Sequence, residues 1–278
     1  MAASKASIAA LFSSPDAQAL GIDPDASDIM IAGLNAGNLP MCVGTPVDML
    51  ESDNVVIIQF ALDASPSMEA VADLLIQTFN DTMIDGLRGA SKSTANTVVV
   101  GGLAFSSNIT PLWGGGFIKL ADLPKLTKRE YNPSRGNGTN LYRAQRDAIT
   151  AAGAYATTVL AETGTPPKII VVALTDGADN HHEVDPADIK ALVDSMTKEF
   201  WKFPCAVFET YESGRVDGRQ IANLTGFDVF EFKPEPNETA QDVQRRFRRM
   251  MGTMSSSVIS ASQTKIGAPA SQTSFWQQ

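Results

Sequence analysis

Continuous apolar runs alternate with amphipathic segments along most of the chain. Three runs rich in β-branched residues cover 54–62, 97–105 and 168–177. Such runs predict strands that are buried on both faces of a parallel sheet. Apolar residues at spacings of three and four predict intervening and closing helices over residues 68–87, 140–160, 188–200 and 239–257. Gly86 and Gly89 are expected to end the first of these helices.

Shorter segments complete the pattern. Residues 204–211 and 228–234 predict two further strands with a short helix at 217–225 between them, and ITPLW at 109–113 predicts a strand that returns antiparallel after a Ser-Ser-Asn turn. Strands that alternate with helices imply right-handed crossovers. The sequence therefore predicts an α/β fold with a mostly parallel sheet and helices on both faces.

The two ends of the chain lack this regular pattern. Residues 1–50 predict an N-terminal extension, with a short helix ending near Gly21 and irregular structure from 21 to 50. Residues 51–259 form the predicted domain, and 260–278 predict a flexible tail rich in Ser, Gln and Ala. Phe275 and Trp276 stand out in that polar tail, and we interpret them as a short docking segment that folds on binding.

Composition narrows the class of protein. Of 278 residues, 44% are hydrophobic and 19% charged, which is enough apolar material for a full core. The net charge of −9 argues against a nucleic-acid-binding chain. No apolar run is long enough for a transmembrane helix, and the stretch 8–12 is too short for a secretion signal. With Cys42 and Cys205 interpreted as reduced thiols, we expect a cytoplasmic protein.

Polar residues follow two of the buried strands and precede the long Ala-rich helix. They are Asp63, Ser65 and Ser67 after the first run, Thr139 within Gly136–Asn140, and Asp176 in Thr175–Gly177. In open parallel sheets, ligands bind outside the carboxyl ends of the strands. Carboxylates and hydroxyls are hard oxygen donors, which suit Mg²⁺, Mn²⁺ or Ca²⁺. A site with few anionic ligands leaves the ion able to accept a carboxylate from outside.

This ordered set of motifs resembles the von Willebrand factor A family, also called the integrin I-domain type, with its metal-ion-dependent adhesion site. The resemblance covers roughly residues 52–257. It implies a doubly wound sheet with one short antiparallel edge strand, which 109–113 fits. It also implies direct metal contact from Ser65, Ser67 and Thr139, with Asp63 and Asp176 acting largely through water. The cofactor expected from the resemblance is Mg²⁺, with Mn²⁺ or Ca²⁺ as alternatives.

Each motif also has a purely structural interpretation. Asp63, Ser65 and Thr139 are residue types that cap helices, and Asp176 with Gly177 suits a simple turn. The adjacent His181 and His182 are interpreted as solvated loop residues. The same holds for the arginines of the last helix, which are Arg245, Arg246, Arg248 and Arg249. No Gly-Lys-Ser/Thr follows the glycines at 114–116, so a phosphate-binding loop is not supported.

The predicted function is cation-dependent protein binding without catalysis. The expected partner supplies an acidic residue to the metal, as an AAA-type ATPase or another subunit of an intracellular assembly, and no membrane or nucleic acid is involved. The alternative is a structural component of a virion or filament. A metal-dependent hydrolase is disfavoured: Ser65 stands where a haloacid-dehalogenase phosphatase needs a second acid, and no G-x-S-x-G is present.

Overall fold

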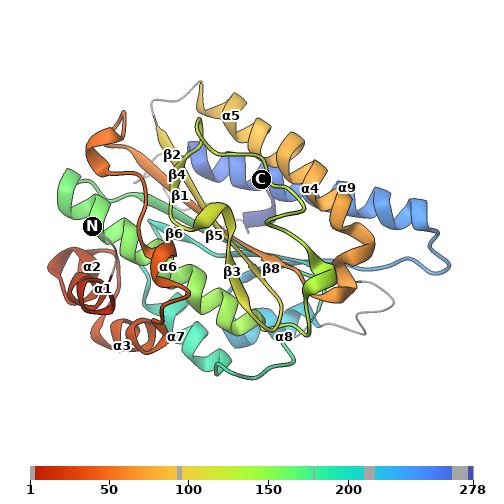
Figure 1. Cartoon of the computed structure of the whole chain (residues 1–278), viewed down its shortest axis with the longest axis horizontal. Helices are drawn as coiled ribbons and strands as arrows, with labels where there is room; N and C mark the ends of the chain where they lie inside the picture. The colour runs from red at the N-terminus through yellow and green to blue at the C-terminus, as the bar shows by residue number, and fades with distance from the viewer. Residues whose placement is uncertain (1–3, 93–95, 178, 210–216, 265–274, 278) are drawn as a thin grey trace.

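One mostly parallel sheet runs through the centre of the structure, a computed structural model that describes residues 4–92, 96–177, 179–209, 217–264 and 275–277 (Figure 1). The strand order is β3-β2-β1-β5-β7-β8, with β4 paired to β2 and β6 to β5. The strands are β1 (Val55–Asp63), β2 (Thr97–Phe105), β3 (Ile109–Pro111), β4 (Ile118–Lys119), β5 (Lys168–Thr175), β6 (Trp201–Lys202), β7 (Pro204–Phe208) and β8 (Asp228–Phe232).

The three central strands are the apolar runs of the sequence. Every residue of β1, β2 and β5 is buried, as expected for strands covered on both faces. β1 pairs in parallel with both β2 and β5. The predicted antiparallel strand is confirmed, since β3 pairs antiparallel with β2, and β4 is a second antiparallel partner that the sequence did not indicate.

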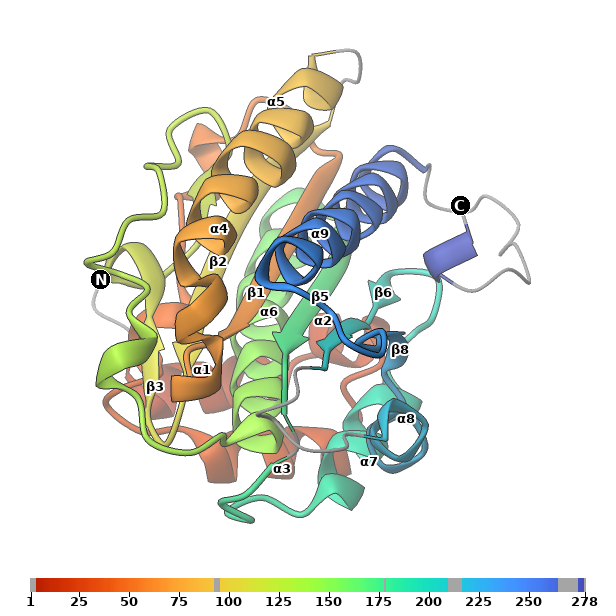
Figure 2. The ribbon, with the colours of Figure 1, turned by 90° about the vertical axis from the view of Figure 1, so that its right-hand side faces the viewer.

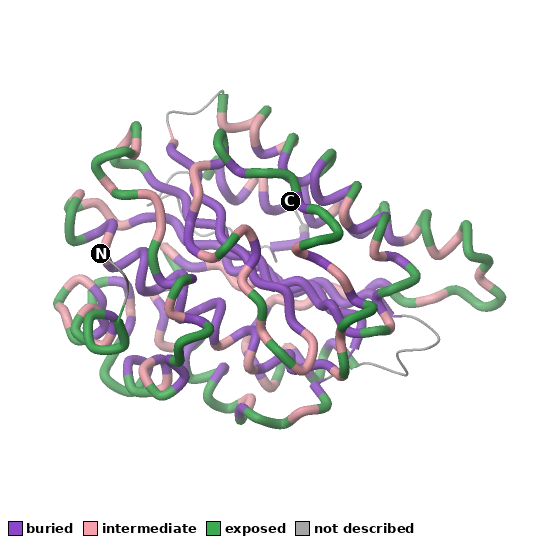
Figure 3. Tube along the Cα trace, viewed as in Figure 1, coloured by how far each residue is buried: buried purple, intermediate pink, exposed green. Residues whose placement is uncertain are grey.

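Helices cover both faces of the sheet, which confirms the predicted fold class (Figure 2). One face carries α6 (Leu141–Thr163), α7 (Pro186–Ser195) and α8 (Gly218–Thr225). The other carries α4 (Ala72–Thr78), α5 (Asp85–Ser91) and α9 (Ala240–Gln263). The sheet is the most completely buried part of the chain, and the outward sides of the helices are exposed (Figure 3).

The helical segment after β1 runs past its predicted end. A 3-10 turn (Pro66–Val71) leads into α4, a π-helical stretch (Phe79–Ile84) and α5, which continues to Ser91. The prediction that Gly86 and Gly89 end this helix is therefore wrong. A Cβ on Gly86 would lie only 2.8 Å from Ile259 Cδ1. Glycine at this position therefore allows α9 to pack closely against α5 and does not end the helix.

The N-terminal extension packs on α6 and α7. Its helices are α1 (Lys5–Phe12), α2 (Pro15–Ala19) and α3 (Pro24–Gly33), so the expectation of irregular structure from 21 to 50 is wrong for 24–33. Asp23 accepts a hydrogen bond from Ala26 N, and Pro24 occupies the first turn, both common helix starts. Trp201 Nε1 donates to Leu20 O at 3.0 Å, which ties the extension to the strand β6.

The C-terminal residues cover the edge strand β8. Of the predicted flexible tail, 265–274 and 278 lie outside the described residues, whereas α9 reaches Gln263. Trp276 Nε1 donates to Asp228 O at 2.8 Å, and its ring lies 5.6 Å from that of Phe230. Phe275 N donates to Asp228 Oδ2 at 2.7 Å, and both aromatic side chains are buried. The segment predicted to dock on a partner therefore docks on its own sheet.

No helix in the described part of the chain is long and apolar enough to span a bilayer.

Trp276→Ala is expected to lower the free energy of unfolding by about 3 kcal/mol, because it removes a buried ring and a hydrogen bond. For a chain of this size, we expect a fall in Tm of roughly 6–12 °C in thermal unfolding. Met49→Ala is the matched control, since Met49 is 60% exposed and its truncation should leave Tm nearly unchanged. Equal Tm values for the two variants would contradict docking of the tail.

Candidate metal centre

The parallel pairing of β1 with β5 places Asp63 and Asp176 at one edge of the sheet. Leu62 lies opposite Leu174 in the ladder, so both strands end at the same level. Asp63 is the last residue of β1, and Asp176 directly follows β5. Both residues are fully buried. The fold thus brings together two carboxylates that are more than a hundred residues apart in sequence.

Asp63 organises the loop that follows β1. Its Oδ2 accepts a hydrogen bond from Thr175 Oγ1 at 2.6 Å, and its Oδ1 accepts one from Ser65 N at 2.8 Å. Its main-chain carbonyl accepts one from the buried Tyr131 hydroxyl at 2.5 Å. Both carboxylate oxygens of Asp63 therefore have protein donors. This fits a carboxylate that positions the neighbouring residues of a site without contacting the bound ion directly.

The two serine hydroxyls converge on Asp176. Ser65 Oγ and Ser67 Oγ are 3.1 Å apart. Asp176 Oδ1 accepts hydrogen bonds from Ser67 at 2.9 Å and from Ser65 at 3.4 Å. Asp176 Oδ2 is buried and has no hydrogen-bond partner among the described residues. A buried carboxylate oxygen without a donor is costly, and a bound cation or an ordered water would satisfy it.

The loop before α6 packs against the loop after β1. A Cβ on Gly136 would lie 2.2 Å from Ala64 O, so only glycine permits this approach. Thr139 N donates to Asn180 Oδ1 at 2.8 Å, and Asn180 N donates to Thr139 O at 2.9 Å. Thr139 Oγ1 would lie 3.7 Å from a Cβ on Gly177. Thr139 is therefore held beside the residue that follows Asp176, without a described hydrogen bond to either serine.

The helix-capping interpretations do not account for these hydroxyls. The N-cap of the 3-10 turn is Ser65, and that of α6 is Asn140, and neither side chain makes a capping hydrogen bond. Thr139 precedes the N-cap of α6. Instead, Asp179 reaches across from the loop after β5, and its Oδ1 accepts from Tyr142 N at 3.2 Å.

Both aspartates have raised pKa values, and burial is the largest cause for each. Burial raises the pKa of Asp63, against hydrogen bonds from Thr175 and Ser65 that lower it. Burial, and after it the charge of Asp63, raises the pKa of Asp176 to about 7, although Ser67 and Ser65 lower it. Burial and the same two carboxylates raise the pKa of Tyr131 well above its usual value. The pair thus carries an electrostatic cost that a cation would relieve.

Three residues around the site were not indicated by the sequence motifs: Tyr131, Asp179 and Asn180. Thr175 belongs to the Thr175–Gly177 motif but was not predicted as a ligand, and its hydroxyl donates to Asp63. Asp179 and Asn180 follow that motif, so their position after a strand was the available signal. Tyr131 had no such signal, because it lies in the predominantly polar stretch 120–137, which has no helix or strand pattern. His182 is exposed as expected, while His181 lies within 3.4 Å of Asn137 O.

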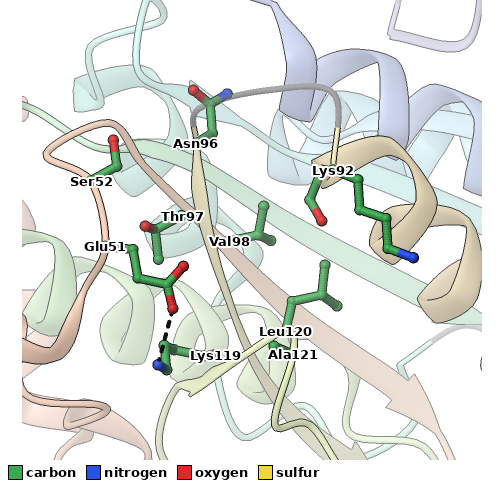
Figure 4. Close-up of a pocket in the computed structure, with 10 residues that line it drawn as sticks. Glu51, Ser52, Lys92, Asn96, Thr97, Val98, Lys119, Leu120 and Ala121 are labelled. Carbon is green, nitrogen blue, oxygen red and sulfur yellow. Dashed lines mark hydrogen bonds and ion pairs between the residues drawn. The ribbon is translucent and has the colours of Figure 1, made fainter.

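A hollow of about 190 Å³ adjoins this edge of the sheet and is lined in part by Ala64, Ser106 and Gly136. Another hollow, of about 430 Å³, lies at the amino end of β2, where Lys119 and Glu51 point toward one another with Nζ and Oε1 3.5 Å apart (Figure 4). None of the five predicted metal ligands lines either hollow, but the first contains Ala64, which lies between Asp63 and Ser65 in sequence. Within the described residues, no group of three or more His, Cys, Asp or Glu side chains is arranged to hold a metal.

The similarities to known proteins concern the fold and not the function. No family model matches the sequence, and no curated protein matches it significantly. The pilus adhesin SpaC from Lactobacillus rhamnosus GG, in an open conformation, is 14% identical with a TM-score of 0.51, over 74% of this chain and 30% of that chain. A von Willebrand factor type A structure from Catenulispora acidiphila is 16% identical with a TM-score of 0.41, over 72% of this chain and 42% of that chain.

The ArnB paralog VWA2 from Sulfolobus acidocaldarius is 14% identical with a TM-score of 0.35, over 69% of this chain and 44% of that chain. This chain therefore spans less than half the length of each of these three structures. At such low identity the similarities concern the fold alone. The chain shares with the pilus adhesin an α/β fold, here a mostly parallel sheet with a short antiparallel edge and helices on both faces.

Proposed function

We propose that this chain binds an acidic group of a partner protein through a divalent cation. The observation that carries the proposal is the cluster at the end of β1 and β5, where two serine hydroxyls meet Asp176 and one oxygen of that carboxylate has no described partner. Hydroxyl and carboxylate oxygens are the donors that Mg²⁺ prefers, with Mn²⁺ and Ca²⁺ as alternatives. Such an ion would supply the compensating charge that the buried aspartates lack.

The residues divide into two roles in this proposal. Ser65, Ser67 and Thr139 would contact the ion directly. Asp63 and Asp176 would act mainly through water, in keeping with the protein donors that already occupy Asp63. Ser67 is only half-buried, which leaves the site accessible from outside. With few anionic ligands, the ion would keep affinity for a carboxylate from another protein, so we propose binding and not catalysis.

The partner class and the compartment remain predictions. An AAA-type ATPase, or another subunit of an assembly in the cytoplasm, is the partner that the resemblance to the von Willebrand factor A family implies. Cys42 and Cys205 are both buried and unpaired, which is consistent with a reducing compartment. A pull-down from lysate with Mg²⁺ or with EDTA tests the partner, and recovery that is equal under both conditions would argue against cation dependence.

Isothermal titration of Mg²⁺ into EDTA-treated protein is expected to show one site in the wild type. Asp63→Asn and the double variant Ser65→Ala/Ser67→Ala should each weaken binding by at least about tenfold, because they remove the groups that form the ligand cluster. Asp28→Ala is the control, since Asp28 is exposed on α3. Circular dichroism establishes that each variant is folded. Folded wild type without Mg²⁺, Mn²⁺ or Ca²⁺ binding would overturn the proposal.

The stability of the metal-free protein is expected to fall with rising pH. Folded Asp176 holds its proton up to a pKa of about 7, whereas its ordinary value is 3.8, so the folded state binds more protons between the two. In EDTA, the wild type should therefore lose Tm relative to Asp176→Asn between about pH 5 and about pH 8. Added Mg²⁺ should restore more stability at the higher pH, and parallel pH profiles of the two proteins would contradict this.

A further inference from the structure

The hollow beside the candidate metal centre has a cationic rim. Its volume is about 190 Å³, below the roughly 300–1,000 Å³ of sites that enclose a small molecule, so it suits a single side chain. The site's own loops form one wall, through Ala64 and Gly136. The remaining lining residues are Ala104, Phe105, Ser106, Asn108, Thr110, Arg129, Glu130, Asn132 and Arg135.

The two arginines of this rim are available to a ligand. Arg129 and Arg135 are exposed, and neither forms an ion pair within the described residues. By contrast, Arg143, on the neighbouring helix α6, pairs with Glu183 at 2.9 Å. The acid of the rim is engaged, because Glu130 Oε2 accepts hydrogen bonds from Thr127 N at 3.2 Å and from the Thr127 hydroxyl. The rim is thus locally cationic on a chain of net charge −9.

The segment that carries both arginines is fixed to the candidate metal loop. Tyr131 lies between the two arginines in sequence. Its side chain is buried, and its hydroxyl donates to Asp63 O at 2.5 Å. After Arg135, Gly136 lies against Ala64 O so closely that a Cβ there would be 2.2 Å away. One anchor lies between the two arginines and the other directly after Arg135, so the backbone that carries them is held near Ser65 and Ser67.

We propose that this hollow receives a second carboxylate from the same partner segment whose first carboxylate binds the metal. The recognised element is then an exposed segment with two acidic groups, and Arg129 and Arg135 determine that specificity. Guanidinium groups bind carboxylates through paired, charge-assisted hydrogen bonds, which makes them selective for this chemistry. The inference rests on the proposed function, because the first carboxylate needs the cation.

Defined carboxylates test the inference without knowledge of the partner. Acetate, succinate, glutarate and adipate are titrated into Mg²⁺-saturated protein, with affinities from amide shifts in NMR spectra. The series of chain lengths samples the span between metal and rim. At least one dicarboxylate is expected to bind about tenfold more tightly than acetate, the gain from one charge-assisted contact.

The double variant Arg129→Gln/Arg135→Gln should lose this gain and keep its affinity for acetate and Mg²⁺. Arg248→Gln is the matched control, because Arg248 is an exposed arginine of α9 that does not line the hollow. Acetate binding without any dicarboxylate gain, or a gain that survives in the double variant, would overturn the second site alone. Failure of acetate to bind the Mg²⁺-saturated wild type would overturn the proposed function, and this inference with it.

Discussion

The parallel register between β1 and β5 is the constraint on which the candidate site depends. It brings the last residue of one strand level with the end of the next, so Thr175 can donate to Asp63 and both serines can reach Asp176. Moving either strand by one residue would turn its side chains to the opposite face. The apolar residues that bury both strands therefore also position the polar residues beyond them.

The elements that the sequence predicts best are those with a strong local pattern. The buried strands are unbroken apolar runs, and the positions after them stood out as candidate ligands because parallel strands end at a common edge. The structure links Asp63, Ser65, Ser67 and Asp176 through a chain of hydrogen bonds and places Thr139 beside Gly177.

The elements that the sequence did not predict depend on contacts between distant segments. Residues 120–137 are predominantly polar, yet Leu123, Leu126 and Tyr131 within them are buried and anchor the segment to the core. Helix α3 was not predicted, although Asp23 and Pro24 mark its start. Its apolar face can be recognised only from its packing against α6. The close approach at Gly86 likewise becomes visible only with α9 in place.

The covered edge at β8 bears on how the molecule avoids aggregation. An open strand edge offers unpaired main-chain groups to any other strand. On one side of this sheet the outer strand β3 spans only Ile109–Pro111. On the other side the indole N–H of Trp276 donates a hydrogen bond to the main-chain carbonyl of Asp228. Removal of Phe275 and Trp276 would therefore expose the main-chain carbonyl of Asp228. An exposed group at a strand edge is a point where a strand of another copy can pair, so this aromatic pair protects one position of the edge.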